Sequence, residues 1–226
     1  MATPAPAAPQ AEPGRDCPLC PRLAAFREQN RAAAPGWHNA PVSSFGGTDA
    51  RLLVVGLAPG LKGANRTGRP FTGDYAGELL YSALLKFGFA EGRYAADPAD
   101  GLVLTGARIT NAVRCVPPEN RPTPLESATC RRFLAAEIAA MPKLRAILAL
   151  GSIAHASALA ALGEKQARFP FAHGTLHGLS AGLILADSYH CSRLNTNTGR
   201  LTQAMFHQVF ADLVWAIGPA DRAMPL

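Results

Sequence analysis

Residues 51–60 read RLLVVGLAPG, a short apolar run that ends at a glycine and continues into a glycine-containing loop. Three similar runs follow, each separated from the next by a segment with helical periodicity. The runs are RLLVVG (51–56), ARITNAV (107–113), RAILALG (145–151) and GLILADSYH (182–190), and the helical segments are 75–87, 125–140, 152–162 and 202–217. Alternating strands and helices predict a parallel sheet covered on both faces. We expect the α/β class: a three-layer α/β/α sandwich around a short, mostly parallel four-stranded sheet.

Polar motifs follow the ends of the predicted strands. GLAPG (56–60) follows the first strand, Asn111 lies toward the end of the second, and His190 ends the fourth. The carboxyl ends of parallel strands share one edge of the sheet, and open α/β sheets bind ligands there. The sequence therefore predicts a single active site at this edge.

Four cysteines form two separated pairs. Cys17 and Cys20 belong to the motif CPLC, at the start of a short helix predicted over 17–30, and Cys115 and Cys130 lie further along the chain. Two pairs of thiolates suit a four-sulfur metal or iron–sulfur site. The alternatives are buried small side chains or disulfides. No secretory signal or membrane span is visible, so we expect a cytoplasmic protein, in which disulfides are rare. Spacing alone does not separate zinc from [4Fe–4S], and the fifth cysteine, Cys191, has no partner.

The composition agrees with a nucleic-acid partner without proving one. The formal net charge is +6, and all but four of the 22 basic residues are arginine, which forms forked contacts to phosphate. A GC-rich genome would produce the same bias. Residues 1–14 are rich in alanine and proline and predict a disordered tail, so residues 15–226 form the single expected domain.

Together with CPLC, three long motifs carry a family resemblance. They are GANRTGRPFTGD (63–74), ITNAVRCVPPENRPTP (109–124) and SYHCSRLNTNTGRLT (188–202). This combination resembles the uracil-DNA glycosylase superfamily, most of all its family 5 branch, over residues 17–210. The resemblance implies a DNA repair enzyme that flips uracil out of DNA and hydrolyses its N-glycosidic bond, leaving an abasic site. It also implies a [4Fe–4S] cluster on Cys17, Cys20, Cys115 and Cys130.

The resemblance assigns base recognition to two side chains. Asn111 matches the base-reading asparagine, whose carboxamide pairs with uracil O4 and N3–H but mismatches cytosine. Its ordinary alternative is a strand-end asparagine in a turn. Phe71 matches the aromatic ring that stacks on the base, and its alternative is a core phenylalanine. Gly56 and Gly60 let the base and the DNA phosphate approach backbone N–H groups.

Two further residues match the chemical roles. His190 would donate to uracil O2 as negative charge develops, although most lone histidines are structural. Asp74 would activate water or stabilise the positive sugar. The loop GLAPG carries Ala58 and no polar side chain, so a carboxylate has to come from elsewhere. The alternative role of Asp74 is to cap the helix that starts near Tyr75.

The expected DNA contacts flank these motifs. We expect phosphate contacts from several arginines, a wedge from Leu194 between base steps, and a contact from Asn195 in the same turn. The arginines are Arg66, Arg69, Arg114, Arg121, Arg193 and Arg200. The expected partner is DNA that contains uracil or another deaminated base, bound to a monomer in the nucleoid, with no membrane.

Two other functions fit parts of the sequence. The first is a non-catalytic DNA-binding module ordered by its metal. The second is a relative that cross-links to the abasic site, but that group carries an inserted loop with a histidine, which residues 60–73 lack. Asn111 would also accept hypoxanthine, because that base presents a carbonyl beside a ring N–H.

Overall fold

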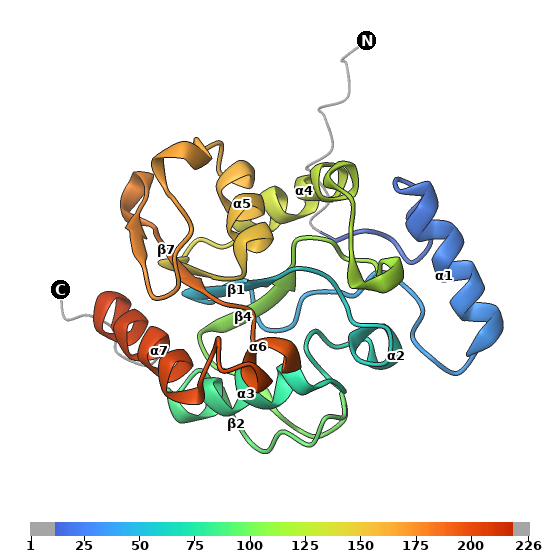
Figure 1. The fold of residues 1–226 in the computed structure, drawn as a ribbon, viewed down its shortest axis with the longest axis horizontal. Helices are drawn as coiled ribbons and strands as arrows, with labels where there is room; N and C mark the ends of the chain where they lie inside the picture. The colour runs from blue at the N-terminus through green and yellow to red at the C-terminus, as the bar shows by residue number, and fades with distance from the viewer. Residues whose placement is uncertain (1–11, 219–226) are drawn as a thin grey trace, which may run out of the picture.

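The computed structural model describes residues 12–218, and its centre is a twisted five-stranded sheet (Figure 1). The strand order is β4-β1-β5-β7-β6. The first four strands are parallel and β6 runs antiparallel at one edge. The bounds are β1 Leu52–Gly56, β4 Ala107–Asn111, β5 Ala146–Leu150, β6 Leu176–Gly178 and β7 Ile184–Ser188.

The predicted sheet is confirmed except for its strand count, which is five and not four. The missed strand, β6, has only three residues, two half-buried and one exposed. Such an edge strand lacks the apolar run that marks a buried strand.

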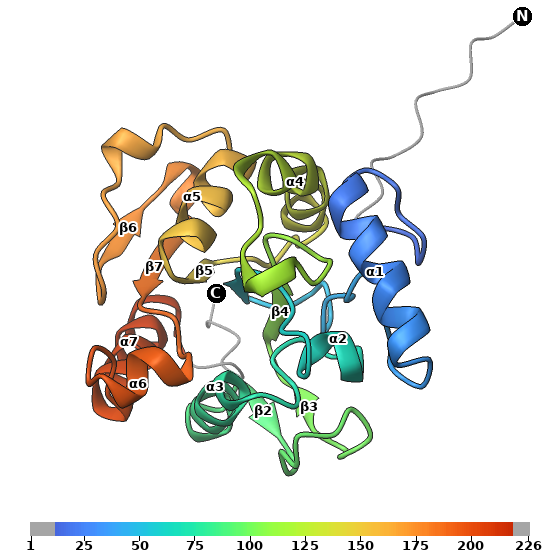
Figure 2. The same cartoon turned by 45° about the vertical axis from the view of Figure 1, so that its right-hand side comes forward.

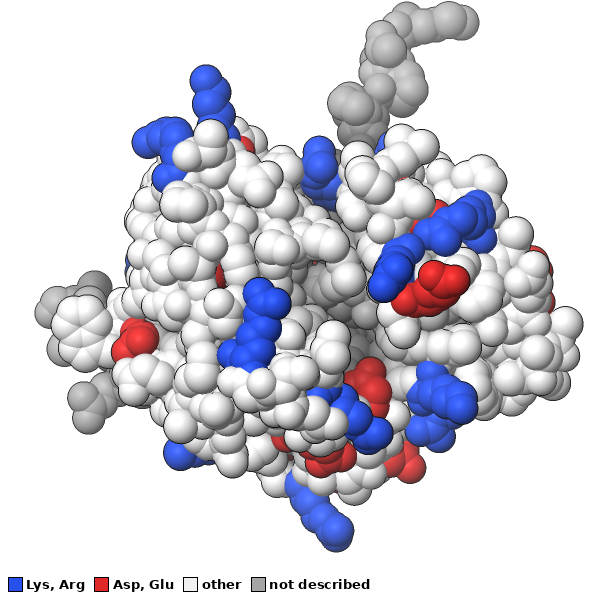
Figure 3. Space-filling model, viewed as in Figure 1, with Lys and Arg blue, Asp and Glu red and all other residues white. Residues whose placement is uncertain are grey.

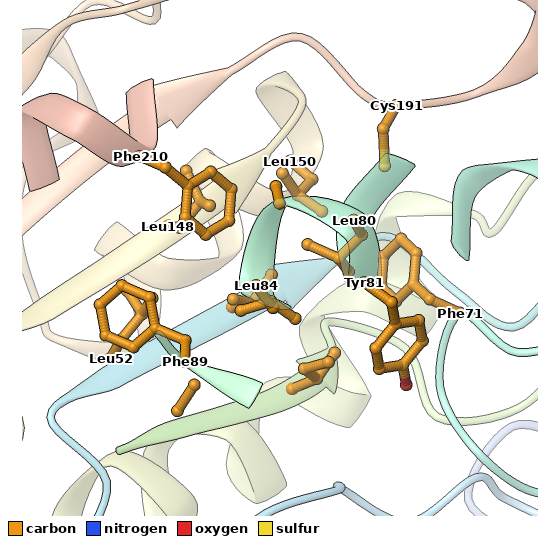
Figure 4. Packing of buried hydrophobic residues seen from close by; sticks show 14 of the residues in the cluster. Leu52, Phe71, Leu80, Tyr81, Leu84, Phe89, Leu148, Leu150, Cys191 and Phe210 are labelled. Atoms are coloured by element: carbon orange, nitrogen blue, oxygen red, sulfur yellow. The ribbon is translucent and has the colours of Figure 1, made fainter. Parts of the chain in front are cut away.

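Helices cover both faces of the sheet, as the alternating pattern predicts (Figures 1 and 2). Every residue of β1 and β5 is buried, so these central strands are apolar on both sides. One face packs against α3 (Tyr75–Lys86) and α7 (Gln203–Ile217), the other against α4 (Pro124–Ala139) and α5 (Ser152–Ala161). Figure 4 shows part of the core between the sheet and helices α3 and α7, with Leu80 and Leu84 of α3 beside the strands.

The order of these helices opens a crevice at one edge. The helices that follow β1 and β7 lie on one face, and those that follow β4 and β5 lie on the other. Connections that leave neighbouring strands toward opposite faces separate at the carboxyl edge and leave room for a ligand. The space-filling view in Figure 3 shows a hollow at the centre of this face.

The remaining elements are short. They are α1 (Pro21–Ala33), α2 (Ala64–Thr67), α6 (Arg193–Asn197), a hairpin of β2 (Ala90–Glu91) with β3 (Val103–Leu104), and three 3₁₀ turns, Pro118–Asn120, Gln166–Arg168 and Ser180–Gly182. The predicted helix over 17–30 begins later, at Pro21, because proline favours the first helical position. Among the described residues, no helix is both long and apolar enough to span a membrane.

The predicted disordered tail is wrong at its end. Residues 1–11 lie outside the described part of the chain, but Glu12 packs against the domain. Its carboxylate accepts from Arg114 at 3.0 Å and from the Ser44 backbone N–H at 3.0 Å. Arg114, the largest fully buried side chain, also pairs with Glu137 at 2.5 Å. Arg114 is therefore a core ion-pair residue and does not contact phosphate, which corrects its expected DNA role.

Candidate active site

Asn111 provides an unsatisfied amide at the carboxyl edge. It is the last residue of β4 and lies in register with Gly56, the last residue of β1. Its side chain is 3% exposed, and Oδ1 has no hydrogen-bond partner in the described part of the chain. A buried amide oxygen without a partner costs about 1–3 kcal/mol. The Asn111 Oδ1 atom is therefore available to accept a hydrogen bond from a ligand.

Gly56 makes room for this amide. A Cβ at position 56 would collide with Asn111 Oδ1 and would lie 2.5 Å from Phe71 Cζ. Only glycine lets both side chains lie against the end of β1. The sequence motif GLAPG thus begins with a glycine that the packing of the pocket requires.

Phe71 lies on the other side of Gly56 in an unusual backbone conformation. Its φ is +53°, in the left-handed region that residues other than glycine rarely adopt. The ring is 6% exposed and faces the imidazole of His190, with centroids 6.0 Å apart and planes inclined at 28°. Phe71, Gly56, Asn111 and His190 therefore come from four segments of the chain and form one chain of contacts.

His190 follows the end of β7 and is held as a neutral imidazole. Burial lowers its pKa to about 4, because the protein interior disfavours the imidazolium. Neither ring nitrogen bonds another residue between 12 and 218, so both are free for a ligand. The carbonyl of His190 accepts from Asn195 Nδ2 at 2.8 Å, and Ser192 caps the short helix α6. The Asn195 Nδ2 group thus orients the histidine turn.

Asp74 lies between the start of α3 and the glycine loop. It caps α3, with Oδ1 accepting from Gly77 N at 3.3 Å. Its other oxygen lies over the glycine loop: a Cβ on Gly60 would be 3.0 Å from Oδ2, and one on Gly63 would collide with it. Burial raises the pKa of the Asp74 carboxyl, opposed by the N–H groups of Gly77 and Ala76. The carboxylate therefore sits beside the loop that lacks polar side chains.

The four predicted ligands surround one cavity. Cys17, Cys20, Cys115 and Cys130 line it together with apolar side chains that include Leu23, Val113 and Phe133. Burial, and then the negative charge of Cys130, raise the pKa of the thiols of Cys20 and Cys115, to about 11 and about 12. Neighbouring thiols oppose ionisation at Cys20, Cys115 and Cys130, and the lining residues include no His or carboxylate. The four cysteines therefore fit a cationic group with an all-sulfur ligand set.

The cysteine cavity adjoins the amide pocket through the main chain. Val113, two residues beyond Asn111, packs in the same cluster as the cysteines and Ala58 of the glycine loop. Ala112 N and Val113 N donate to the carbonyls of Gly56 and Leu57 at 2.9 Å each, which ties the end of β4 to the loop. A fixed arrangement of the four cysteines therefore supports the end of β4, which carries Asn111, and the glycine loop bonded to it.

A family model for the uracil DNA glycosylase superfamily matches residues 43–214, a span that includes Asn111, Asp74 and His190. This chain belongs to the uracil DNA glycosylase superfamily.

Curated relatives place it in the type-5 branch of that superfamily. A type-5 uracil-DNA glycosylase of Thermus thermophilus is 46% identical over 202 residues, which cover 87% of this chain and 91% of the relative. Type-5 enzymes of Mycobacterium leprae and Pyrobaculum aerophilum are 45% and 41% identical, covering 87% and 83% of this chain and 89% and 83% of the relatives.

Several residues predicted to contact DNA are exposed, and Arg66, Arg193, Leu194 and Arg200 are called the rim below. Leu194 projects from α6 with 73% of its surface exposed. Arg193 and Arg200 are exposed, and their guanidinium groups lie over the rings of Tyr75 and Tyr189 at 5.3 and 4.6 Å. Arg66 is also exposed, with Nε donating to the Lys62 carbonyl. Figure 3 shows basic side chains spaced around the hollow, with acidic ones among them.

Arg69 does not join this rim, which corrects its predicted DNA contact. Its side chain is 5% exposed and forms a two-pronged ion pair with Asp100, at 2.8 and 2.7 Å. Bidentate pairing occupies both terminal nitrogens of the guanidinium. The sequence missed this partner because Asp100 lies 31 positions away in a polar connection.

A second cluster of buried polar side chains centres on Asp187 of β7, and the sequence analysis does not predict it. Asp187 accepts from His155 Nδ1 at 2.7 Å, from His177 Nε2 at 3.0 Å and from Ala172 N at 3.2 Å, while His155 Nε2 bonds the Phe169 carbonyl at 2.9 Å. This donor set has the composition of a metal site. Each carboxylate oxygen already pairs with its own imidazole, however, so we interpret the group as a hydrogen-bond network that anchors the strand before His190.

Proposed function

We propose that this protein excises uracil from DNA as a monofunctional glycosylase. The observation that carries the proposal is the unsatisfied Oδ1 of Asn111, buried against Gly56 beside the ring of Phe71, which in turn faces His190. An amide oxygen accepts, so the ligand must present a donor there, and the neighbouring Nδ2 group requires an acceptor. Uracil N3–H and O4 supply this pair in the right order.

Cytosine presents the reverse arrangement. Its N3 is an acceptor and its exocyclic amine is a donor, so Oδ1 of Asn111 would face N3 and Nδ2 would face the amine. Each unpaired buried group costs about 1–3 kcal/mol. The same reasoning admits hypoxanthine, which offers a ring N–H beside a carbonyl. A base inside the duplex cannot reach Asn111, so it must be flipped into the pocket.

The remaining groups match the charges of the reaction. As the C1′–N1 bond breaks, its electron pair leaves with uracil, and the neutral His190 imidazole donates a hydrogen bond to O2. The Asp74 carboxylate faces the positive sugar and takes a proton from the water that adds to C1′. The products are uracil, which regains a proton from solvent, and an abasic site.

The same proposal assigns the four cysteines to a [4Fe–4S] cluster. When bound, such a cluster would crosslink the start of α1, the loop after β4 and the middle of α4, and so supply structural order. The residues that would hold it are Cys17, Cys20, Cys115 and Cys130. It takes no part in the steps above, which depend on side chains of the pocket.

Duplex DNA with one U·G pair tests the proposal. We expect free uracil and an alkali-labile site at that position, in equal amounts. DNA binding without base release would instead support the non-catalytic module.

We expect freshly purified protein to contain iron and sulfide and to absorb visible light. Cys115→Ala should lose most of both, because three thiolates hold the cluster less firmly than four. Cys191→Ala is the matched control, since Cys191 is buried in the main core, apart from the cysteine cavity. One zinc ion in a colourless protein would refute the iron assignment and keep the ligands.

Rim arginines should account for much of the salt dependence of DNA binding. We expect Arg193→Ala and Arg200→Ala each to weaken binding and to reduce the slope of log affinity against log salt by about 0.9, the release expected per phosphate contact. The choice of base should not change. Lys143→Ala is the control, because Lys143 precedes β5 at the opposite edge of the sheet. Equal slopes for all three variants would contradict these contacts.

A further inference from the structure

The strained backbone at Phe71 is held from outside the base pocket. The carbonyls of Pro70 and of Phe71 itself both accept hydrogen bonds: the Tyr81 hydroxyl donates to Pro70 O at 2.7 Å, and the Tyr94 hydroxyl donates to Phe71 O at 3.2 Å. Left-handed conformations of non-glycine residues cost of order 1 kcal/mol or more and persist only where the surroundings impose them. These two hydroxyls are the nearest candidates to impose it.

Arg69 organises the same turn. Its Nε donates to Thr72 Oγ1 at 2.7 Å, and that hydroxyl donates to Pro70 O at 3.2 Å. The guanidinium lies over the rings of Tyr81 and Tyr94, 5.3 and 5.8 Å from their centroids. The two tyrosine rings stack on each other at 4.5 Å. Figure 4 shows Tyr81 beside Phe71 at one end of the core.

Asp100 links the stacked side chains of Arg69, Tyr81 and Tyr94 to the connection between β2 and β3. Besides the ion pair with Arg69, its carboxylate accepts from Ala95 N at 2.9 Å and Leu102 N at 3.0 Å. The hydrogen bond from Arg69 holds the pKa of this carboxyl well below its usual range. The bonded connection carries Tyr94, so Asp100 fixes the place of the hydroxyl that reaches Phe71.

Helix α3 closes the arrangement from the other side. A Cβ on Gly77 would collide with the Phe71 carbonyl and with the Tyr94 hydroxyl, so both atoms pack directly on the helix. Burial raises the pKa of Tyr94 to about 12, which keeps its hydroxyl protonated and able to donate.

We propose that Arg69, Tyr94 and Asp100 are positioning residues that hold Phe71 in the left-handed conformation its ring needs to stack on the flipped base. This inference rests on the proposed function, because it concerns the capture of uracil by the same pocket. The three residues act through Phe71 and do not touch the reacting atoms. The connection 92–101 is thus a determinant of base binding, although it lies far from the pocket motifs in sequence.

The inhibition of base release by free uracil measures base capture without DNA flipping. We expect Tyr94→Phe and Asp100→Asn each to raise the inhibition constant of uracil about three- to tenfold, the effect of losing one or two hydrogen bonds. Asp97→Asn is the matched control in the same connection, because within residues 12–218 its side chain bonds only the nearby Ala99 N–H. This variant should leave the constant unchanged.

A double-mutant cycle with Phe71→Ala distinguishes positioning from general stability. Without the ring, Tyr94→Phe and Asp100→Asn should change the inhibition constant by less than about twofold, because their effect passes through Phe71. The positioning role would be overturned if either substitution raised the inhibition constant of uracil as much in the Phe71→Ala background as in the wild type. It would also be overturned if either single variant lowered the melting temperature but left the inhibition constant unchanged. A wild-type protein that releases no uracil would overturn the proposed function and this inference together.

Discussion

Asp74→Asn is expected to lower the single-turnover rate of uracil release by roughly 10²-fold or more, a typical contribution from a positioned acid or base. Asparagine caps helices about as well as aspartate, so the bond to Gly77 N and the stability of α3 should survive. The missing element is the negative charge beside Gly60 and Gly63. The measurement is single-turnover base release together with a thermal melt.

Asp74→Ala completes this comparison, because it removes the cap as well as the charge. We expect it to be as slow as Asp74→Asn and also less stable, by about 1 kcal/mol. If Asp74→Asn kept a near-normal rate while Asp74→Ala lost stability, Asp74 would be a helix cap only.

The pH dependence of the same rate has a defined sign. Burial raises the pKa of Asp74, so its active carboxylate is lost as the pH falls through that raised value. His190 stays neutral down to a pKa of about 4 and ionises only below it. Wild-type activity should therefore decline on the acid side as the Asp74 carboxylate takes up a proton. In Asp74→Asn this decline should disappear.

His190→Ala should also lower the rate by roughly 10²- to 10³-fold, the cost of one donor aimed at developing charge. Binding of uracil-containing DNA should change far less, because Asn111 and Phe71 still hold the flipped base. His207→Ala is a matched control: His207 contacts Lys86 at the end of α3 opposite Asp74. An equal loss of rate and binding in His190→Ala would show that the histidine supports the pocket and is not an oxyanion donor.

The position of the candidate site could be predicted from sequence because its residues lie at the ends of strands. Asn111 and His190 each end an apolar run, and topology brings the ends of such runs to one edge, where Asn111 lies beside Gly56 and His190 faces the ring of Phe71. Asp74 was predictable for a different reason: GLAPG offers no polar side chain, and a carboxylate starts the next helix.

Partners distant in sequence explain what could not be predicted. The motif GANRTGRPFTGD does not reveal that the carboxylate partner of Arg69, Asp100, lies in a remote connection, so the sequence alone predicts a DNA contact for Arg69. Glu12 belongs to an alanine- and proline-rich stretch whose composition hides its ion pair with Arg114. His155 lies in a helix that reads as apolar, and its bond to Asp187 depends on how α5 packs on β7.

The central claim is that the unsatisfied amide of Asn111 selects the base, and the most direct test is the ratio of two single-turnover rates for the wild-type protein. The substrates are identical duplexes that differ only in carrying uracil or cytosine opposite guanine. Two mismatched groups at about 1–3 kcal/mol each predict that uracil is released roughly 10²-fold faster or more. Release of both bases at similar rates would contradict base reading by Asn111.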